Sequence, residues 1–264
     1  YDVVHIHWLP NGVVGLLLGR PFFAQAHGSD LHVNLANPAY RALTRRVLRK
    51  ATNVFYVTPN LRAYMNGYEA KLRYLPNPVD VDAIAPSANP PERLSKVLIF
   101  TRLDPVKGVD RIFPAAERLS RSVELTAPDW GPLASQYRQL YGHHVRFAAP
   151  VPHAEIGKFV QQFDVVIGQM KQGILSLSEI EAMAAGRPVI TAVNWDLYDD
   201  KPPVIGASGP DEIVAAVEGL KADPARLAAL SEEGREWVRR NHSPRRHLEI
   251  LEAAYFGAGT STAR

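Results

Sequence analysis

The stretch "KVLIFTRLDPVKGVDRI", residues 96–112, joins a short apolar run, two cations and the start of a helical pattern. The run "KVLIF" is typical of a strand buried on both faces of a parallel sheet. After the cations, apolar residues recur at the spacing of one helical face: Val109, Ile112, Phe113, Ala116 and Leu119. The stretch therefore predicts a strand–loop–helix unit, and such units in series build a parallel α/β fold.

The loop of this unit carries two cations, Arg102 and Lys107. Open parallel sheets bind their ligands outside the carboxyl ends of the strands, which is where this loop is expected. The amino end of the following helix adds a partial positive charge. The combination favours a phosphate or pyrophosphate ligand. The alternative is a surface ion pair, with Asp104 or Asp110 as the partner.

The composition is that of a soluble globular protein, with 46% hydrophobic and 22% charged residues among 264. The chain has no cysteine, which excludes disulfides and thiolate metal sites and is compatible with a reducing compartment. No apolar run approaches the roughly 18 residues of a membrane span, so a cytoplasmic location is expected. The length suffices for one large or two ordinary domains.

Short apolar runs alternate with helical patterns on both sides of a segment rich in Pro, Ala and Ser, residues 77–95. We expect strands at 2–8, 20–27, 52–58, 71–76, 96–100, 123–127, 144–149, 163–168 and 187–193. This alternation predicts two Rossmann-like parallel-sheet domains. We expect the first, which is short, at 1–90 and the second at 91–240. A last helix at 241–264, starting at Pro244, is expected to pack back toward the first domain.

The stretch "GILSLSEIEAMAAGRPVIT", residues 173–191, supports two interpretations. In the structural one, Ser178 and Glu181 form an S-x-x-E capping pattern, and Gly186 ends the helix. In the functional one, Glu181 lies at the carboxyl edge of the sheet and accepts hydrogen bonds from two vicinal sugar hydroxyls. Gly173 and the amides after it would then approach a phosphate closely.

These stretches together resemble the GT-B glycosyltransferases, in particular the retaining enzymes called family 4. "FTRLDPVKGVDRI" is similar to the family's G-R-L-x-x-x-K-G motif, which implies that Arg102 and Lys107 hold the donor diphosphate. "EAMAAGRPVI" is similar to E-A-M-A-x-G-x-P-V-I, which implies that Glu181 holds the ribose. "HGSD" resembles the H-G that faces the transferred sugar, here His27 and Gly28. "LPNPVDVDAIAP" resembles the P-N-G-V-D segment before the interdomain linker.

The resemblance implies a retaining transfer of a sugar from a nucleotide-sugar donor, most plainly a UDP- or GDP-sugar, bound between the two domains. The acceptor would be a sugar, a lipid-linked sugar or a small molecule. No cofactor and no metal are expected, since Arg102 and Lys107 would offset the charge on the leaving diphosphate. With His27 near the sugar, these are the three residues to which we assign catalysis.

The sequence departs from the family pattern at the sugar site. The family usually has a Glu eight residues before the one at 181, and here that position is Gly173. We therefore expect the sugar to be held through Gln172 and by three backbone amides, those of Ile174, Leu175 and Ser176.

Two further departures concern the second domain's loops and the start of the chain. "APDWGP", residues 127–132, replaces a Gly-rich turn, so Trp130 is expected to wall the site. The base is expected to meet backbone near Val151. The family's first strands are not present before Tyr1, which makes the first domain truncated or minimal.

Basic residues cluster between Arg41 and Lys50 in a predicted helix. This helix is either an ordinary solvated one or a peripheral contact with the inner face of a membrane. Nucleic acid is not expected, because no groove-reading motif occurs. His5 and His7 share a strand face, but without a third ligand they predict no metal site.

Three alternatives to a self-sufficient transferase remain open at this point. The same fold could carry a nucleotide-sugar epimerase or hydrolase that needs no acceptor. It could instead be a non-catalytic subunit that binds nucleotide. Finally, a short chain could complete its site by pairing with another polypeptide.

Overall fold

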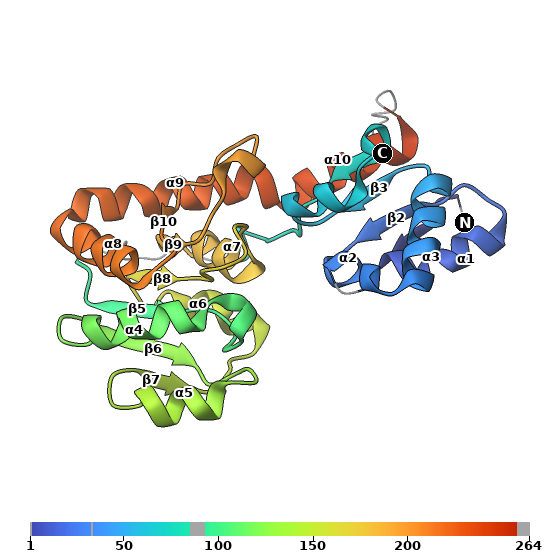
Figure 1. Cartoon of the computed structure of the whole chain (residues 1–264). Helices are drawn as coiled ribbons and strands as arrows, with labels where there is room; N and C mark the ends of the chain where they lie inside the picture. The colour runs from blue at the N-terminus through green and yellow to red at the C-terminus, as the bar shows by residue number, and fades with distance from the viewer. Residues whose placement is uncertain (1, 33, 85–92, 258–264) are drawn as a thin grey trace. The chain divides into compact units, whose positions relative to one another are not determined.

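The computed structural model describes residues 2–32, 34–84 and 93–257. The chain forms two compact units, the first made of Tyr1–Pro78 and Pro244–Arg264 and the second of Val79–Ser243 (Figure 1). The boundary predicted between residues 90 and 91 lies outside the described residues. The units separate earlier, between Pro78 and Val79.

The first unit is built on a four-stranded parallel sheet in the order β1-β2-β3-β4. Its strands are β1 (His5–His7), β2 (Phe23–Ala26), β3 (Val54–Tyr56) and β4 (Leu72–Tyr74). The predicted parallel sheet is confirmed. Its helical segments are η1 (Leu9–Gly12), α1 (Val13–Leu18), α2 (Ser29–His32), η2 (Asn34–Ala36), α3 (Pro38–Lys50), η3 (Pro59–Met65), η4 (Glu69–Lys71) and α10 (Pro244–Phe256).

Residues 59–71 form no α-helix, and this segment is made of the two short 3-10 helices η3 and η4. Gly67 lies between them with a φ of 88°, a conformation that ends a right-handed helix.

The two faces of the first sheet are covered by different helices. Because strand side chains alternate, Phe23 and Phe55 point to one face and Ala24 and Val54 to the other. Phe23, Phe55 and Leu75 form a small core that α10 covers through Ile250, Leu251, Ala254 and Tyr255. The opposite face forms the larger core, with residues of α3 and η3 such as Val47 and Leu61. The last helix is therefore part of the first unit.

The second unit has a six-stranded parallel sheet in the order β10-β9-β8-β5-β6-β7. Its strands are β5 (Lys96–Ile99), β6 (Glu124–Pro128), β7 (Arg146–Ala148), β8 (Val165–Ile167), β9 (Val189–Thr191) and β10 (Ile205–Gly206). The five predicted strands are confirmed. β10 was missed because two residues make no detectable pattern. The chain starts in the middle at β5, runs outward to β7 and returns to β8, so the strand order reverses between β5 and β8.

Helices cover both faces of this second sheet. They are η5 (Pro105–Lys107), α4 (Val109–Leu119), α5 (Ala134–Tyr141), η6 (His153–Glu155), α6 (Ile156–Val160), α7 (Leu177–Ala184), η7 (Trp195–Leu197), α8 (Pro210–Ala222) and α9 (Pro224–His242). The predicted helix α4 is confirmed, and all five apolar positions of its predicted face are buried. Within the described residues, no helix combines the length and the apolar character that crossing a membrane requires.

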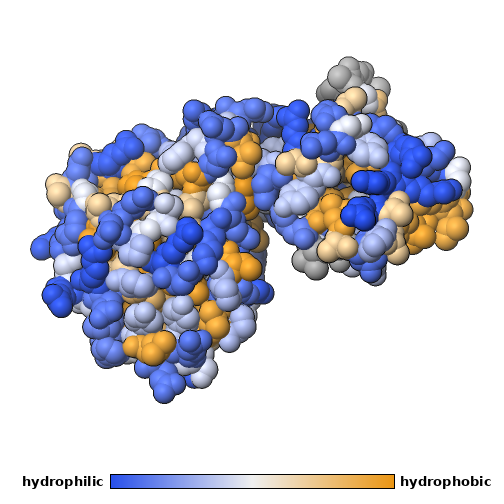
Figure 2. Space-filling view, in the orientation of Figure 1, coloured by the Kyte–Doolittle hydropathy of each residue, from blue (hydrophilic) through white to orange (hydrophobic). Residues whose placement is uncertain are grey.

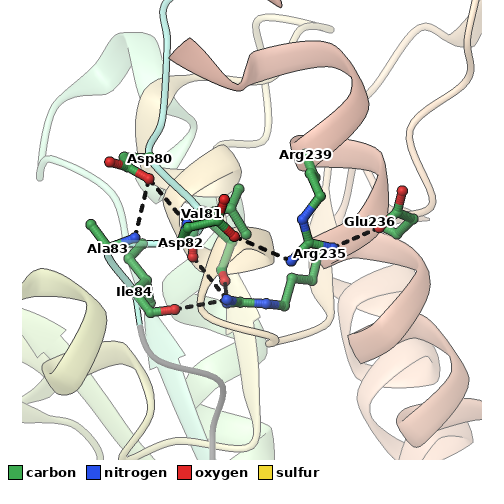
Figure 3. A network of polar contacts seen from close by, with 9 residues as sticks. Asp80, Val81, Asp82, Ala83, Ile84, Arg235, Glu236 and Arg239 are labelled. Carbon is green, nitrogen blue, oxygen red and sulfur yellow. Dashed lines mark hydrogen bonds and ion pairs between the residues drawn. The ribbon is translucent and has the colours of Figure 1, made fainter. Parts of the chain in front are cut away.

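The start of the predicted linker is fixed to the second unit. The Arg235 guanidinium, on α9, donates to the carbonyls of Val81 at 2.8 Å and Ile84 at 2.7 Å (Figure 3). Arg239, one turn further on, pairs with Asp82 at 3.6 Å. Val79 and Val81 are buried in the core beneath. Residues 79–84 are thus structural, whereas 85–92 lie outside the described residues.

Candidate functional site

The site of the second unit lies where the strand order reverses, at the carboxyl ends of β5 and β8. Two loops leave the sheet here, residues 100–108 after β5 and residues 168–176 after β8. In open parallel sheets, such a reversal leaves a crevice between two loops that diverge in opposite directions. The sequence-predicted cations lie on the first loop, and the Gly173 region on the second.

Arg102 and Lys107 are both held by polar partners at this edge. Arg102 forms an ion pair with Asp104, and its side chain remains 45% exposed. Lys107 Nζ donates to Gln172 Oε1 at 2.9 Å, which joins the two loops. Burial lowers the pKa of Lys107, since the half-buried ammonium has lost part of its hydration. The ion pair expected from sequence as the alternative to phosphate binding is thus present, and it leaves Arg102 accessible.

Asp104 organises the first loop. Its carboxylate accepts from the Val106 amide at 3.1 Å and caps η5. The Val106 amide and then Arg102 lower the pKa of Asp104, so this carboxylate stays ionised.

Gly108 is needed for the loops to meet. It has a φ of 77°, and a Cβ there would lie 2.9 Å from Met170 Cβ. Across this contact the Met170 amide donates to the Lys107 carbonyl at 2.8 Å. The glycine after the lysine therefore lets the second loop approach the first, and this approach sets the position of Lys107.

The turn that carries Trp130 packs against the backbone of Leu103, the residue after Arg102. The Leu103 amide donates to the Trp130 carbonyl at 2.9 Å. Gly131 has a φ of 124°, and a Cβ there would lie 2.5 Å from the Leu103 carbonyl oxygen. The turn pairs closely with the backbone next to Arg102, while the Trp130 side chain is 55% exposed. Its predicted role as a wall of the site stays a prediction.

Gln169 shapes the second loop, and sequence reasoning missed it. It is fully buried, and its Oε1 accepts from the amides of Lys171 at 2.9 Å and Gln172 at 2.6 Å. Its Nε2 donates to the carbonyls of Ile174 at 2.8 Å and Ala192 at 2.9 Å. The side-chain amide of Gln169 thus provides hydrogen-bond partners for buried backbone groups of the loop that lack partners within the loop itself.

Glu179 anchors the same loop from α7. Its Oε1 accepts from the Gln169 amide at 2.7 Å, and its Oε2 accepts from the amide of Ser176 at 2.7 Å and from its hydroxyl. This is a capping box with Ser176 as the N-cap. The predicted box of Ser178 and Glu181 is therefore wrong. Glu179 is completely buried, and burial raises its pKa.

The amides predicted to hold the sugar are mostly occupied. The Leu175 amide donates to the Tyr198 hydroxyl at 2.7 Å, and the Ser176 amide is used by Glu179. Gln172 is engaged with Lys107. Sugar binding by these groups stays a prediction, and it would require the Leu175 and Ser176 amides to change partner. The Ile174 amide remains available, since it has no hydrogen-bond acceptor within the described part of the chain.

Gly173 lies at the exposed turn of this loop, with a φ of 68°. Its carbonyl accepts from the Asn194 amide at 2.9 Å. The left-handed conformation explains a glycine at this position in backbone terms.

Glu181, also on α7, takes no part in the capping box. Its side chain is 9% exposed, and its Oε1 lies 2.9 Å from Nε2 of His153, which is 81% exposed. Burial raises the pKa of Glu181, and the contact with His153 opposes that rise. An exposed imidazole is a displaceable partner, so vicinal hydroxyls of a ligand could take its place. Val151 lies two residues before His153, half-buried between β7 and η6.

In the first unit, Asp30 fixes the end of β2. This buried carboxylate accepts from the amides of His27 at 3.1 Å, Gly28 at 2.8 Å and Leu9 at 3.0 Å. Gly28 has a φ of 113°, which lets the chain turn sharply after the strand. The predicted pair His27 and Gly28 thus lies at the carboxyl end of β2.

Three histidines lie side by side, His5 and His7 on β1 and His27 at the carboxyl end of β2. His7 Nδ1 lies 3.1 Å from His27 Nε2, and the rings of His5 and His7 stack at 4.7 Å. His5 Nδ1 bonds the Tyr255 hydroxyl of α10. Burial and then the neighbouring His7 lower the pKa of His27. The same causes lower the pKa of His5 to about 4. No group of three potential ligands with metal-binding geometry occurs in the described ranges.

Acidification is expected to destabilise the first unit. Because the pKa of His5 falls from 6.5 unfolded to about 4 folded, only the unfolded chain binds this proton between those values. The free energy of unfolding should drop by about 1 to 2 kcal/mol as pH falls from 6.5 toward 4, after allowance for partial exposure. Urea unfolding at pH 6.5 and 5.0, with His5→Gln as control, measures this. An equal pH dependence in both proteins would contradict it.

Two family models cover most of the chain. One described as glycosyl transferase-like matches residues 110–253, which include the second loop and Glu181. Another, described as a glycosyl transferase 4-like domain, matches residues 1–78, which include His27.

Curated and solved proteins agree with these models. The chain is 29% identical, over 83% of its length, to a GDP-mannose-dependent alpha-(1-6)-phosphatidylinositol monomannoside mannosyltransferase of Mycolicibacterium smegmatis. It spans 65% of that relative's length. Sucrose-phosphate synthase of Thermosynechococcus elongatus has a TM-score of 0.76 at 20% identity, covering 96% of this chain and 72% of its own. Anabaena Alr3699/HepE, solved with UDP and glucose, has a TM-score of 0.77 at 16% identity, covering 96% and 77%. The fold is GT-B, and the chain belongs to the glycosyl transferase-like family, among the group 1 glycosyltransferases.

Proposed function

We propose that the chain transfers a sugar from a UDP- or GDP-sugar to a hydroxyl acceptor, with retention and without a divalent metal. The observation that carries the proposal is the pair Arg102 and Lys107 at the strand-order reversal of the second unit. Both are cations at the carboxyl edge of the sheet, and the start of α4 adds its dipole to them. This arrangement is suited to a diphosphate.

The chemistry needs positive charge more than a nucleophile. When the bond between the anomeric carbon and the diphosphate oxygen breaks, the electron pair leaves with the nucleoside diphosphate. Arg102 and Lys107 would stabilise this growing negative charge, which is the role that a divalent cation plays in other phosphate chemistry. The acceptor oxygen forms the new glycosidic bond, and its proton passes to the departing nucleoside diphosphate or to water. No protein nucleophile is assigned.

The diphosphate would bind by exchanging partners. Lys107 donates to Gln172 and Arg102 pairs with Asp104, so both cations are already oriented. A charged phosphate oxygen is a stronger hydrogen-bond acceptor than a neutral amide oxygen. The Lys107 ammonium would therefore exchange its hydrogen bond to Gln172 for one to the phosphate. Burial lowers the pKa of Lys107. A bound anion beside the ammonium would raise this pKa again, because the anion stabilises the charged form.

The nucleoside would be held further along the same edge. We assign the ribose hydroxyls to Glu181, where they would replace the exposed His153, and the base to the backbone near Val151. The Ile174 amide and Gly173 would face the sugar. In the first unit, His27 and Gly28 are assigned to the transferred sugar or its acceptor.

The names of similar proteins bear on the donor and the acceptor. One relative is named as dependent on GDP-mannose and as acting on a phosphatidylinositol monomannoside. One structural neighbour was solved with UDP and glucose. A UDP- or GDP-sugar donor and a sugar, lipid-linked sugar or small-molecule acceptor remain our proposal for this chain. Cytoplasmic location and peripheral membrane contact through residues 41–50 are likewise proposals.

Calorimetric titration with UDP, GDP and ADP, followed by donor turnover with and without acceptors, tests the proposal. We expect micromolar binding of one diphosphate in EDTA, and loss of donor only when an acceptor is present. Donor loss without acceptor would instead indicate a hydrolase or epimerase. Binding without any turnover would indicate a non-catalytic subunit, and no binding would refute the donor site.

A further inference from the structure

The second unit contains a cavity that the proposed function leaves unused. Hydrophilic residues cover most of the face of this unit that Figure 2 shows, so a binding site is better sought in a cavity than on a broad apolar patch. The cavity has a volume of about 410 Å³ and lies at the carboxyl ends of β8, β9 and β10 (Figure 1). This volume is within the range of sites that hold small molecules.

We call this cavity the Trp195 pocket. The residues that line it include Arg111, Gly173, Asn194, Trp195, Ser208 and Glu212. Of the residues assigned above to the donor, all of which lie in the described part of the chain, Gly173 alone lines the pocket. The pocket is therefore distinct from the sites assigned to the diphosphate and the ribose, and it adjoins the candidate site at Gly173.

Trp195 gives the pocket an apolar wall. Its Nε1 donates to the Pro202 carbonyl at 3.2 Å, which fixes the polar edge of the indole. Gly206, on β10, also lines the pocket, and a Cβ at this position would collide with the Trp195 ring. The ring therefore lies against the backbone of the strand, in an approach that only glycine permits. A half-buried indole in a cavity is a surface on which the apolar side of a ligand can pack.

Asn194, the residue before this wall, supplies a hydrogen-bond donor. Its Oδ1 accepts from the Asp196 amide at 3.1 Å and caps η7. Its Nδ2 has no acceptor within the described ranges. The backbone of Asn194 is fixed as well, because its amide donates to the Gly173 carbonyl at 2.9 Å. The side chain is thus oriented through its oxygen, while its two N–H groups are left for a ligand.

Arg111 and Glu212 add one charge of each sign to the lining of the pocket. Arg111 Nη1 donates to the carbonyls of Met170 at 2.8 Å and Ser208 at 3.0 Å. Glu212 Oε2 accepts from the Ser208 amide at 2.7 Å. Among the residues that the structure describes, Arg111 Nη2 and Glu212 Oε1 have no hydrogen-bond partner. The pocket therefore offers a ligand both donors and an acceptor.

The charges of the pocket favour a neutral ligand over an anion. Lys171, another cation in its lining, is already paired with Asp110 at 2.7 Å. The charge of Arg111 is then opposed by that of Glu212, which would repel a phosphate. A sugar ring matches the groups that remain. Its hydroxyls both donate and accept hydrogen bonds, and the C–H groups on one side of the ring suit an aromatic wall.

We propose that the Trp195 pocket binds one neutral sugar unit. The ring packs on the indole of Trp195, the Asn194 amide and Arg111 Nη2 donate to its hydroxyls, and Glu212 accepts from one of them. Two sources fit this chemistry, the sugar of the donor and a separate sugar such as one of the acceptor. The choice between these sources rests on the proposed function, whereas binding of the sugar itself does not.

Fluorescence titration of the whole chain with methyl α-mannoside and methyl α-glucoside tests the inference. Trp195 is one of four tryptophans, so we expect the emission to change saturably at millimolar concentrations of one or both glycosides. Sorbitol, which has no ring, should cause no such change. Asn194→Ser keeps a good N-cap but loses the amide donor, and should weaken binding by about two- to tenfold. Trp195→Leu should abolish the response of the emission.

Asn37→Ser is the matched control. Asn37 is the exposed N-cap of α3 in the first unit, where its Oδ1 accepts from the Ala39 amide at 2.9 Å. This variant should bind both glycosides like the unchanged chain, and circular dichroism establishes that each variant is folded. If Trp195→Leu does not fold, Asn194→Ser still decides, because it retains the cap and all four tryptophans.

Titration with UDP-glucose, GDP-mannose and the corresponding diphosphates identifies the source of the sugar. If Asn194→Ser weakens binding of a nucleotide sugar but not of its diphosphate, the pocket holds the sugar of the donor. If a saturating nucleotide sugar leaves glycoside binding intact, the pocket holds a separate sugar. Failure of every nucleotide to bind would refute the proposed function and leave the glycoside result standing.

Four results would overturn the inference. The first is the absence of a saturable response to either glycoside, and the second is an equal response to sorbitol. The third is a response that folded Trp195→Leu retains, which would place the sugar elsewhere. The last is equal binding of the glycosides by Asn194→Ser and Asn37→Ser, since the amide of Asn194 would then make no contact with the sugar.

Discussion

Replacing Lys107 with alanine is expected to weaken binding of the nucleoside diphosphate by roughly 10- to 100-fold, the equivalent of about 1.5 to 3 kcal/mol. The size follows from the setting of the side chain. The ammonium is half-buried, it is already directed by Gln172 at 2.9 Å, and burial has lowered its pKa. A preoriented, partly desolvated cation contributes more to anion binding than a mobile one on the surface.

Calorimetric titration of the variant measures this loss, with Lys96→Ala as the matched control. Lys96 is an exposed lysine at the opposite end of β5, so its removal changes the net charge equally without touching the site. Unchanged affinity in Lys107→Ala, or an equal loss in both variants, would show that the diphosphate binds elsewhere. Arg102→Ala should behave like Lys107→Ala, with a smaller effect because Arg102 is more exposed.

Replacing Glu179 with alanine is expected to lower the free energy of unfolding of the second unit by about 3 kcal/mol or more. The carboxylate is completely buried and accepts from the Gln169 amide and from the amide and hydroxyl of Ser176. Its removal leaves these donors without a partner, and each buried unsatisfied donor costs about 1 to 3 kcal/mol. The helix cap is lost at the same time.

Urea unfolding followed by tryptophan fluorescence measures this change, since Trp130, Trp195 and Trp237 all lie in the second unit. Glu179→Gln keeps one acceptor oxygen and should lose less stability than Glu179→Ala. Glu233→Ala, an exposed carboxylate on α9, should change the free energy by no more than about 0.5 kcal/mol. A loss for Glu179→Ala no larger than that control would mean that the capping box does not support the loop.

The strands and α4 were predictable from the sequence because their signals are local. A run such as "KVLIF" is apolar on both faces, and the periodicity of residues 109–119 fits only a helix. The positions of Arg102 and Lys107 after β5 followed from the same pattern, since a loop must leave a parallel strand at its carboxyl end. The sequence by itself thus determined the fold class and the edge of the sheet that carries the cations.

The exact roles of the residues in 168–181 were decided by tertiary structure. In "SLSEIE", residues 176–181, Ser176 with Glu179 and Ser178 with Glu181 both satisfy S-x-x-E. The pattern therefore cannot say which carboxylate caps the helix. The choice depends on the Gln169 amide at the end of β8, which only the packed sheet brings within 2.7 Å of Glu179.

The same reason explains the other differences. Whether the Leu175 amide is free depends on Tyr198, 23 residues away, and the close approach of Gly12 and Gly15 to the unit depends on Val47 and Phe22. Local sequence fixes which elements form. The hydrogen bonds and close contacts that assign each polar or apolar side chain its direction join residues far apart in the chain, so they exist only once the elements have packed.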